Sequence, residues 1–279
     1  MMRKAQTLVG LFAVVLFIWS STISAAPKAQ LIPFWNASNE ANSATIDHSA
    51  WQTILNRYLV ANHPSGVSRF NYAKLTANTA DGNKLDEYLS YLQKLDPRTY
   101  SKAEQKAYWI NFYNALTIQV VLSAYPVSSI TKIYDGWFGF GPWDDVHAKV
   151  AGQRLTLNDI EHGILRPIWK NDNRIHYAVN CASYGCPNLA SEAYTAANMD
   201  RLLEQGARDY VNHPRGVQFK SDGTLLVSSI YRWYKRDFGG TNASVIRHWR
   251  QYAKPRLAKR LWRYNGPIDH DYNWSLNAN

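Results

Sequence analysis

The sequence has few cysteines and few long apolar runs. Two cysteines among 279 residues exclude a disulfide-rich scaffold and a four-cysteine zinc site. The longest apolar run, near the N-terminus, is shorter than the ~18 to 20 residues that a membrane-spanning helix needs. With 46% hydrophobic residues and no internal repeat or low-complexity tract, the chain is too apolar for a disordered protein. We therefore expect a globular chain whose cysteine chemistry is confined to Cys181 and Cys186.

The first 26 residues have the pattern of a secretory signal peptide. Two basic residues precede the apolar run 8–19, and small residues follow it. We expect cleavage near Ala25 or Ala26 and export, to the periplasm in a Gram-negative cell. An uncleaved N-terminal anchor is the alternative. Export to an oxidising compartment favours oxidised cysteines.

Three segments follow from this interpretation. Residues 1–26 are the signal peptide, and residues 27–48, rich in Ala, Asn, Ser and Pro, are expected to be a poorly ordered lead-in. Residues 49–279 are expected to form a single globular domain, because their length fits one core.

The chain is basic, with 31 Lys and Arg against 21 Asp and Glu and a net charge of +10. The segment 247–263 is basic without any acidic residue, and Trp249, Tyr252 and Trp262 are interleaved in it. It predicts a solvated basic helix face or a surface that binds an anionic envelope component, such as lipid head groups. Nucleic acid is not expected as a partner, because an exported protein rarely meets it.

Local patterns predict the remaining elements. Alternation predicts short strands at 68–72 and 174–181, and a turn at Asp222-Gly223 predicts a hairpin over 217–227. Helical spacing and capping residues predict helices over 49–59, 84–95, 157–165, 195–212 and 230–238.

A further helix is predicted over 102–124, opened by the capping box Ser101 to Glu104 and closed by Pro126. This helix is apolar on almost every face, which is typical of a buried helix. It nevertheless contains Asn111 and Asn114, whose buried amides need specific partners. They either form a structural network with a neighbouring loop or line an active site.

The predicted helix 157–165 places Glu161 on its apolar face and His162 further outward. A carboxylate on a buried face needs a partner, so Glu161 is either salt-bridged or a catalytic or orienting group. The aromatic loop 135–146, which includes Trp137, is either a substrate wall or part of the core.

The stretch from His176 to Pro187 carries the candidate chemistry. His176 and Asn180 share one face of the predicted strand 174–181. If Pro187 begins a helix, Cys186 lies at its N-cap, where the helix dipole lowers the thiol pKa.

Three interpretations of the two cysteines remain open: a Cys181–Cys186 disulfide, a nucleophilic or redox thiol, or two inert buried residues. In the second, His176 or His162 is the base. We expect no cofactor and no metal, because the Cys and His spacing fits no standard zinc site.

Several motifs together resemble the bacterial and plant family called domain of unknown function 547. They lie at 107–118, 157–162, 176–187, 229–238 and 272–277. The resemblance spans about residues 68–277 and includes both cysteines. Because the family also includes intracellular plant proteins, it favours a thiol role over a purely structural disulfide.

We expect an α+β single domain with a buried central helix packed on a small mixed or antiparallel sheet. This expected arrangement, a buried helix packed on a sheet with a histidine-bearing strand, also resembles the papain and transglutaminase folds. However, the central helix carries Asn111 and Asn114 in place of a cysteine, and both cysteines follow the histidine.

The leading hypothesis is a thiol-dependent hydrolase or acyl or amide transferase that acts on a small molecule or peptide. Its catalytic residues would be Cys186, His176, Glu161 and Asn114, and its binding residues Asn111, His162, Asn180, Cys181 and Trp137. The alternatives are a non-catalytic envelope-binding protein with a structural Cys181–Cys186 disulfide, and a thiol–disulfide redox protein.

Overall fold

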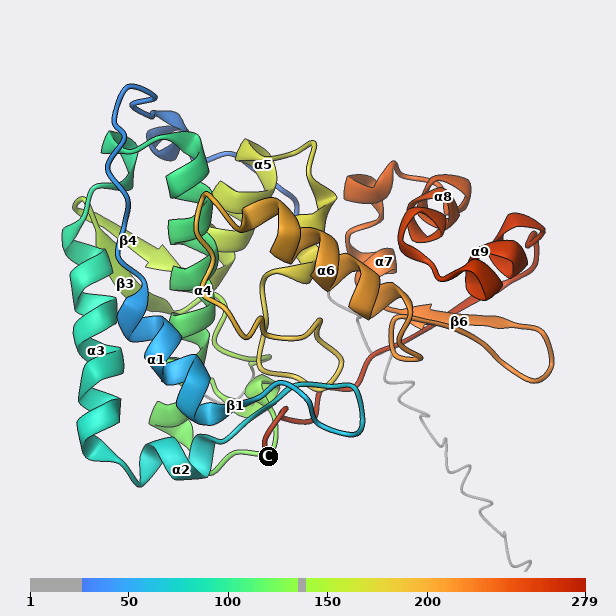
Figure 1. Ribbon diagram of the computed structural model, residues 1–279, viewed down its shortest axis with the longest axis horizontal. Helices are drawn as coiled ribbons and strands as arrows, with labels where there is room; N and C mark the ends of the chain where they lie inside the picture. Colours follow the sequence, from blue (N-terminus) through green and yellow to red (C-terminus); the bar gives the residue numbers. More distant parts are fainter. Residues whose placement is uncertain (1–26, 135–138) are drawn as a thin grey trace, which may run out of the picture.

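A computed structural model describes residues 27–134 and 139–279 (Figure 1). The expected signal peptide and the candidate binding residue Trp137 lie outside these residues. Across the two described ranges, no helix is both long enough and apolar enough to cross a bilayer.

The chain alternates between helices and very short strands. The first half contains η1 (Pro33–Asn36), α1 (Ser49–Tyr58), β1 (Leu59–Val60), β2 (Arg69–Phe70), α2 (Tyr72–Thr76), α3 (Thr79–Lys94), η2 (Pro97–Thr99), α4 (Lys102–Ala124) and η3 (Ile130–Lys132). The middle contains β3 (Val146–Val150), β4 (Gln153–Thr156), η4 (Asp159–Leu165), α5 (Arg166–Ile168), η5 (Asn173–Tyr177) and α6 (Met199–Val211). The last part contains β5 (Val217–Phe219), β6 (Leu225–Ser228), α7 (Ile230–Trp233), η6 (Lys235–Phe238), α8 (Asn242–Tyr252), α9 (Pro255–Trp262) and β7 (Ile268–Asp271).

The expected α+β class and single domain are confirmed, with small separate sheets. β1–β2 and β3–β4 are antiparallel pairs, and β6 joins β5 in antiparallel and β7 in parallel orientation. The hairpin predicted over 217–227 is therefore present. Strand β7 carries no alternating apolar signal, and it pairs with β6 through its backbone.

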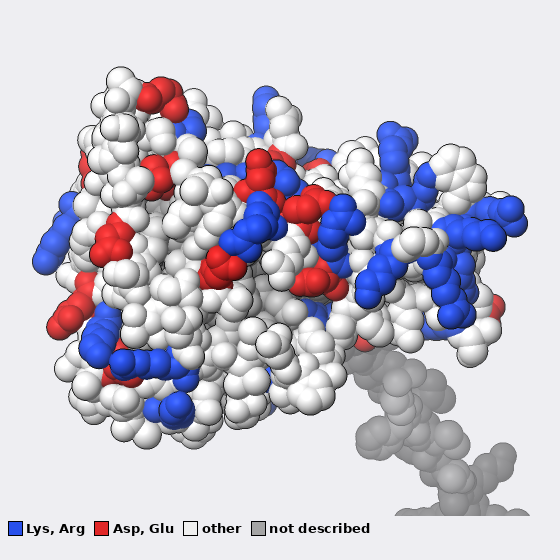
Figure 2. Space-filling view, in the orientation of Figure 1, with Lys and Arg blue, Asp and Glu red and all other residues white. Residues whose placement is uncertain are grey.

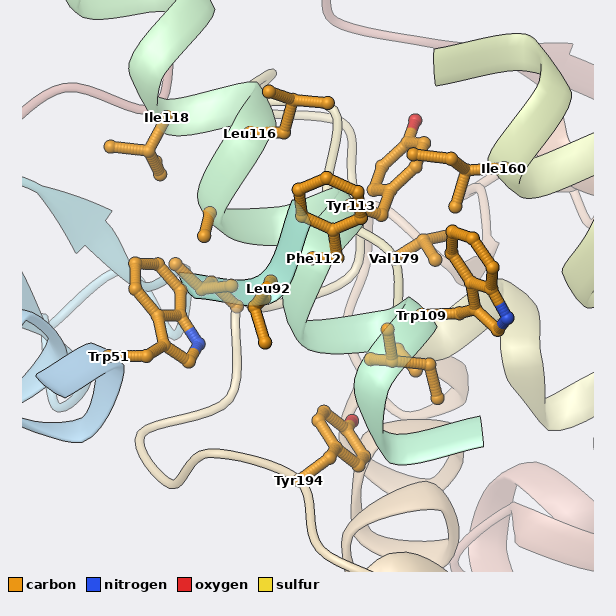
Figure 3. Packing of buried hydrophobic residues seen from close by; sticks show 14 of the residues in the cluster. Trp51, Leu92, Trp109, Phe112, Tyr113, Leu116, Ile118, Ile160, Val179 and Tyr194 are labelled. Carbon is orange, nitrogen blue, oxygen red and sulfur yellow. The ribbon is translucent and has the colours of Figure 1, made fainter. Parts of the chain in front are cut away.

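Helix α4 lies at the centre of the larger core, as its apolar composition predicts. The Ser101 side chain accepts a hydrogen bond from the Glu104 amide, which caps the first turn. Every residue from Glu104 to Ile118 is buried. Figure 3 shows side chains of α1, α3, η4 and the segments near Val179 and Tyr194 around it.

A second, smaller core is formed mostly by residues between 207 and 261. It contains residues of α6, β5, β6, α7, α8 and α9, among them Tyr210, Trp249 and Leu261. Helix α6 contributes to both cores, with Leu202 and Leu203 in the larger one and Tyr210 in the smaller. In Figure 1 this helix runs between the two halves of the fold.

The two buried asparagines of α4 bond the backbone of irregular segments. Asn111 Nδ2 donates to the Tyr194 carbonyl at 2.7 Å, and its Oδ1 accepts from the Tyr194 amide at 2.9 Å. Asn114 Nδ2 donates to the Ala178 carbonyl at 2.9 Å, and its Oδ1 accepts from the Asn180 amide at 2.8 Å. Both amides thus satisfy a donor and an acceptor of buried backbone that has no strand partner.

The prediction of a strand over 174–181 is wrong. Residues Asn173–Tyr177 form a 3₁₀ helix, which Asp172 caps by accepting from the Arg174 amide, and irregular backbone follows. All residues from Ile175 to Asn180 are buried. The segment is therefore apolar on every side because it is enclosed by the core, although it does not pair in a sheet. Asn114 supplies the hydrogen bonds that a neighbouring strand would have made.

Residues 27–48, expected to be a poorly ordered lead-in, instead lie against the domain. The Gln30 and Ile32 amides donate to the carbonyls of His162 and Gly163, both at 2.9 Å. Trp35 and Ile46 are buried in the larger core. Their two apolar side chains stabilise a segment whose average composition is polar.

Several predicted helix ends are displaced, in each case by a local capping contact. α3 begins earlier, at Thr79, because Asn78 caps it. α6 begins only at Met199, because the Thr195 amide donates to the Asn198 side chain and starts a turn there. The helix predicted over 230–238 is divided into α7 and η6 at Tyr234.

We predict that Asn114→Ala lowers the free energy of unfolding by about 1–3 kcal/mol, because it leaves buried backbone groups without partners. Urea denaturation measures this. The control is Gln119→Ala on the same helix, whose side chain bonds Asp86 at the surface and which should cost less than about 0.5 kcal/mol. Equal costs for the two variants would contradict the structural role of Asn114.

Candidate thiol site

The two cysteines lie together and share a tyrosine. Both are free thiols. The Tyr272 hydroxyl donates to Cys186 Sγ at 3.1 Å and lies 3.3 Å from Cys181 Sγ. The Cys181 amide also donates to Cys186 Sγ, at 3.0 Å. The Ser183 hydroxyl completes the group, 3.2 Å from Cys181 Sγ and 2.9 Å from the Tyr272 hydroxyl oxygen, to which it donates.

These contacts and burial shift the pKa values of the two thiols in opposite directions. Burial by itself raises the pKa of Cys186, but hydrogen bonds from Cys181, Ser183 and Tyr272 outweigh it and lower the pKa to about 6. Burial raises the pKa of Cys181 well above its usual value, and its hydrogen bond to Cys186 raises it further. The contacts therefore favour ionisation of Cys186 over ionisation of Cys181.

The expected helix N-terminus at Cys186 is absent. No helical residue lies between Cys186 and Asn198, and α6 begins at Met199. The pKa of Cys186 is therefore lowered by individual N–H and O–H donors and not by a helix dipole.

Asn180 fixes the loop that carries both thiols. Its Oδ1 accepts from the Ala182 amide at 2.8 Å and its Nδ2 donates to the Pro187 carbonyl at 2.7 Å. Ala182 has a φ of 60°, a left-handed conformation that non-glycine residues adopt at a cost. The Asn180 side chain thus holds both ends of a strained turn, and Asn114 holds the Asn180 backbone.

Gly185 allows the C-terminal segment to approach this loop. Its amide donates to the Asn273 carbonyl at 2.8 Å. A Cβ at this position would lie 2.9 Å from that oxygen, which is too close for any other residue. The close approach brings Tyr272 to the thiols.

The thiols differ in exposure. Cys186 is 4% exposed, whereas Cys181 is half-buried. Beside them, an open groove is lined by Ser128, Ser129, Thr131, Lys132, Asp271, Tyr272, Asn273, Trp274 and Ser275. Rings of Phe140, Trp143, Trp233 and Trp274 pack in succession next to Tyr272. Tyr272, whose hydroxyl lies beside both sulfurs, is part of the lining of this groove.

The predicted histidines belong to a separate buried group. His176 Nε2 lies 2.8 Å from Asp237 Oδ2, and Arg166 Nε donates to the same oxygen at 2.7 Å. Burial opposes ionisation of Asp237, but these two hydrogen bonds hold its pKa well below the usual range. Arg166 also lies 2.9 Å from His162 Nδ1. Within residues 27–134 and 139–279, no histidine hydrogen-bonds to either sulfur.

Glu161 lies on η4, which is a π-helix. The Arg166 amide donates to the Glu161 carbonyl, five residues back. This wider turn accommodates Pro167, which has no amide hydrogen and would clash in a regular α-helix, so the helix continues to Ile168 beyond its predicted end. Glu161 is 7% exposed and its carboxylate lies 3.7 Å from His162 Nδ1.

Two buried tyrosines, Tyr113 and Tyr234, have raised pKa values. Burial raises the pKa of Tyr113 and Tyr234 well above the usual value, and the negative charge of Glu161 raises it further. The Tyr234 ring also stacks on His176, with centroids 4.3 Å apart. Tyr234 thus packs directly against the His176–Asp237 group.

Some site residues were not predicted from the sequence. Tyr272, Ser183 and Asp237 lie inside the motifs that resemble the family, and this position is the sequence feature that could have pointed to them. Arg215, whose Nε donates to the Cys186 carbonyl at 3.1 Å, lies outside all of them. Among the described residues, no three His, Cys, Asp or Glu side chains are grouped as metal ligands.

Comparison with known proteins gives a family match over part of the chain. The model of the family described as "Protein of unknown function, DUF547" matches residues 97–211, which include α4, η4, the thiol loop and α6. No curated protein and no solved structure matches the chain, so the resemblance to papain and transglutaminase stays a prediction. Residues 97–211 are therefore similar to the DUF547 family.

Proposed function

We propose that the chain is a thiol–disulfide exchange protein in which Cys181 and Cys186 are the reactive pair. The observation that carries this proposal is the shared hydroxyl of Tyr272, within 3.3 Å of both sulfurs. Two free thiols so placed, one ionised and one protonated, are what dithiol exchange needs.

The exposures of the two thiols assign a role to each, and the Cys186 thiolate serves as the base for Cys181. As a substrate disulfide enters the groove, the Cys181 proton passes to the Cys186 thiolate. Cys181 sulfur then attacks one substrate sulfur, and the other leaves as a thiolate. Cys186 gives up its proton to that leaving thiolate and attacks Cys181 sulfur, which releases the second substrate sulfur as a thiolate that takes a proton from solvent. The substrate disulfide is reduced to two thiols, and the pair is oxidised to a disulfide.

Hydrolysis or acyl transfer with Cys186 as nucleophile is the second candidate, favoured by the low pKa of Cys186. It needs a base that can protonate the leaving group. His176 is buried and bonded to Asp237, which leaves it a weaker candidate for that role. Cys186 is also nearly inaccessible, so a bulky acyl group would reach Cys181 first.

Export would connect this chemistry to a source of oxidant. The pattern of residues 1–26 favours an oxidising compartment, where the disulfide form of the pair is renewed. A structural disulfide in a non-catalytic binding protein would form there too. The exchange protein and the structural-disulfide protein differ in how readily the Cys181–Cys186 disulfide is reduced.

We predict reversible oxidation of the pair. Incubation of the full chain with mixtures of reduced and oxidised glutathione, followed by acid quenching, alkylation and mass measurement, should give a midpoint within the glutathione range. Cys186→Ser should accumulate a mixed disulfide at Cys181, whereas Cys181→Ser should trap about tenfold less.

A pair that stays oxidised under strongly reducing glutathione would favour the structural disulfide. Equal trapping by the two serine variants would contradict the assigned roles. Thermal unfolding of both variants shows whether either result follows from loss of the fold.

We predict that thiol reactivity depends on pH through Cys186. A group with a lowered pKa is ionised above that value, so thiolate absorbance and exchange rate should rise as pH increases through about 6. Tyr272→Phe removes one donor to the thiolate and should raise this midpoint by about 1 to 2 pH units. Tyr91→Phe, an exposed tyrosine on α3, is the matched control. An unchanged midpoint in Tyr272→Phe would rule out the assigned hydrogen bond.

We predict that His176→Gln leaves the exchange rate within about twofold of the unchanged chain at equal folded fraction, because His176 bonds to neither sulfur. A thiol hydrolase with His176 as base would lose about 10²-fold or more. Exchange with oxidised glutathione, measured beside the circular dichroism of the variant, separates the two. A loss of that size in the folded variant would favour the acyl-transfer candidate.

A further inference from the structure

We propose that helices α8 and α9 form a surface that binds an anionic phospholipid membrane. We call this the basic surface, and it comprises Arg247, Arg250, Lys254, Arg256, Lys259, Arg260 and Arg263. No acidic residue lies between Asn242 and Arg263. In Figure 2 these blue side chains gather at the end of the molecule where Figure 1 labels α8 and α9.

The charges of the basic surface are not neutralised within the protein. Among the residues that the structure describes, none of the seven forms an ion pair. All except Arg250, which is half-buried, are exposed. Elsewhere Arg57, Arg98, Arg174, Arg201 and Arg208 are each paired with a carboxylate. Cations without counter-charges on one face favour an anionic partner.

The basic surface rests on a well-packed support. Val245 and Trp249 of α8 and Leu261 of α9 are buried in the smaller core. The side chains of Thr241 and Ser244 form a capping box at the start of α8. Because the apolar residues face inward, the charged ones are presented outward without a change of fold.

Trp262 distinguishes a membrane from other anionic partners. It is 68% exposed, and the Arg250 guanidinium stacks on its ring with the carbon 3.6 Å from the centroid. A tryptophan among cations suits the membrane interface, where the indole reaches into the head groups and the cations contact phosphate.

Single-stranded nucleic acid, by contrast, stacks its bases on several exposed rings along a groove. On α8 and α9, Trp249 is buried and Tyr252 is half-buried, so Trp262 is the one fully exposed ring of these two helices. Export directed by the apolar run 8–19, which the sequence predicts, would also bring the chain to a membrane. The observations thus favour lipid.

The test is co-sedimentation of the full chain with vesicles. Vesicles of phosphatidylglycerol mixed with phosphatidylcholine are compared with vesicles of phosphatidylcholine alone, at low and high salt. We expect tight binding to the anionic vesicles at low salt and a large loss at high salt, because screening weakens the attraction. The triple variant Arg256→Gln, Lys259→Gln, Arg263→Gln should bind roughly a hundredfold more weakly, since each basic residue contributes about fivefold.

The matched control is Lys94→Gln, Lys149→Gln, Arg154→Gln, which removes the same charge from exposed positions on α3, β3 and β4. It should bind within about threefold of the unchanged chain. Because all variants keep the N-terminal apolar run, differences between them report on the basic surface. Trp262→Ala should weaken binding severalfold without changing its dependence on salt.

Three results would overturn the proposal. Equal losses in the two triple variants would show an effect of net charge alone. Binding of the unchanged chain to phosphatidylcholine as tight as to anionic vesicles would show that the basic surface is not used. Tighter binding to a single-stranded oligonucleotide than to anionic vesicles, lost in the same triple variant, would assign the surface to nucleic acid. Circular dichroism confirms that each variant is folded.

Discussion

The hydrogen bonds of Asn114 are the constraint on which the site depends. Helix α4 is buried on every side, so its neighbours must be apolar or fully bonded. The segment beside it has no strand partner, and Asn114 bonds its backbone at Ala178 and Asn180. Asn180 in turn bonds both ends of the thiol loop, at Ala182 and Pro187. An apolar residue in place of Asn114 would leave the Ala178 carbonyl and the Asn180 amide without their hydrogen-bond partners. This change would be destabilising, because the cost of an unpaired buried amide exceeds the gain from burying a methyl group.

The thiolate illustrates how short-range donors replace a helix dipole. Desolvation is the largest influence on the pKa of Cys186 and acts against ionisation. An N–H and an O–H within 3.1 Å of its sulfur reverse that effect. Since the contacts favour ionisation at Cys186 and burial disfavours it at Cys181, the site avoids burying two negative charges. A single buried charge with several donors costs far less than a pair of like charges.

The sequence predicts elements whose signals are local and misses contacts between distant segments. Helix α4 and the β5–β6 hairpin follow from a capping box, an apolar run and an Asp-Gly turn. The stretch 174–181 looks like a strand because the burial of residues 175–180, and not sheet pairing, makes it apolar. His176 and Asp237, and Cys186 and Tyr272, are far apart in the chain, and single-sequence patterns do not report such pairs. The motifs that resemble the family nevertheless contain Tyr272 and Asp237. The sequence therefore indicates which residues belong to the site better than it indicates which of them are in contact.

The C-terminal segment connects the two functions that we propose. After α9 the chain forms β7, which pairs with β6 over four residues, and Tyr272 follows directly. The position of the Tyr272 hydroxyl is therefore fixed by β6 on one side and by the Gly185–Asn273 hydrogen bond on the other. Only five residues separate α9 from β7, so the basic surface and the donor to the thiolate belong to one short, well-anchored stretch. A membrane held against α8 and α9 would leave this stretch in place, because the contacts that position Tyr272 are made by the protein itself.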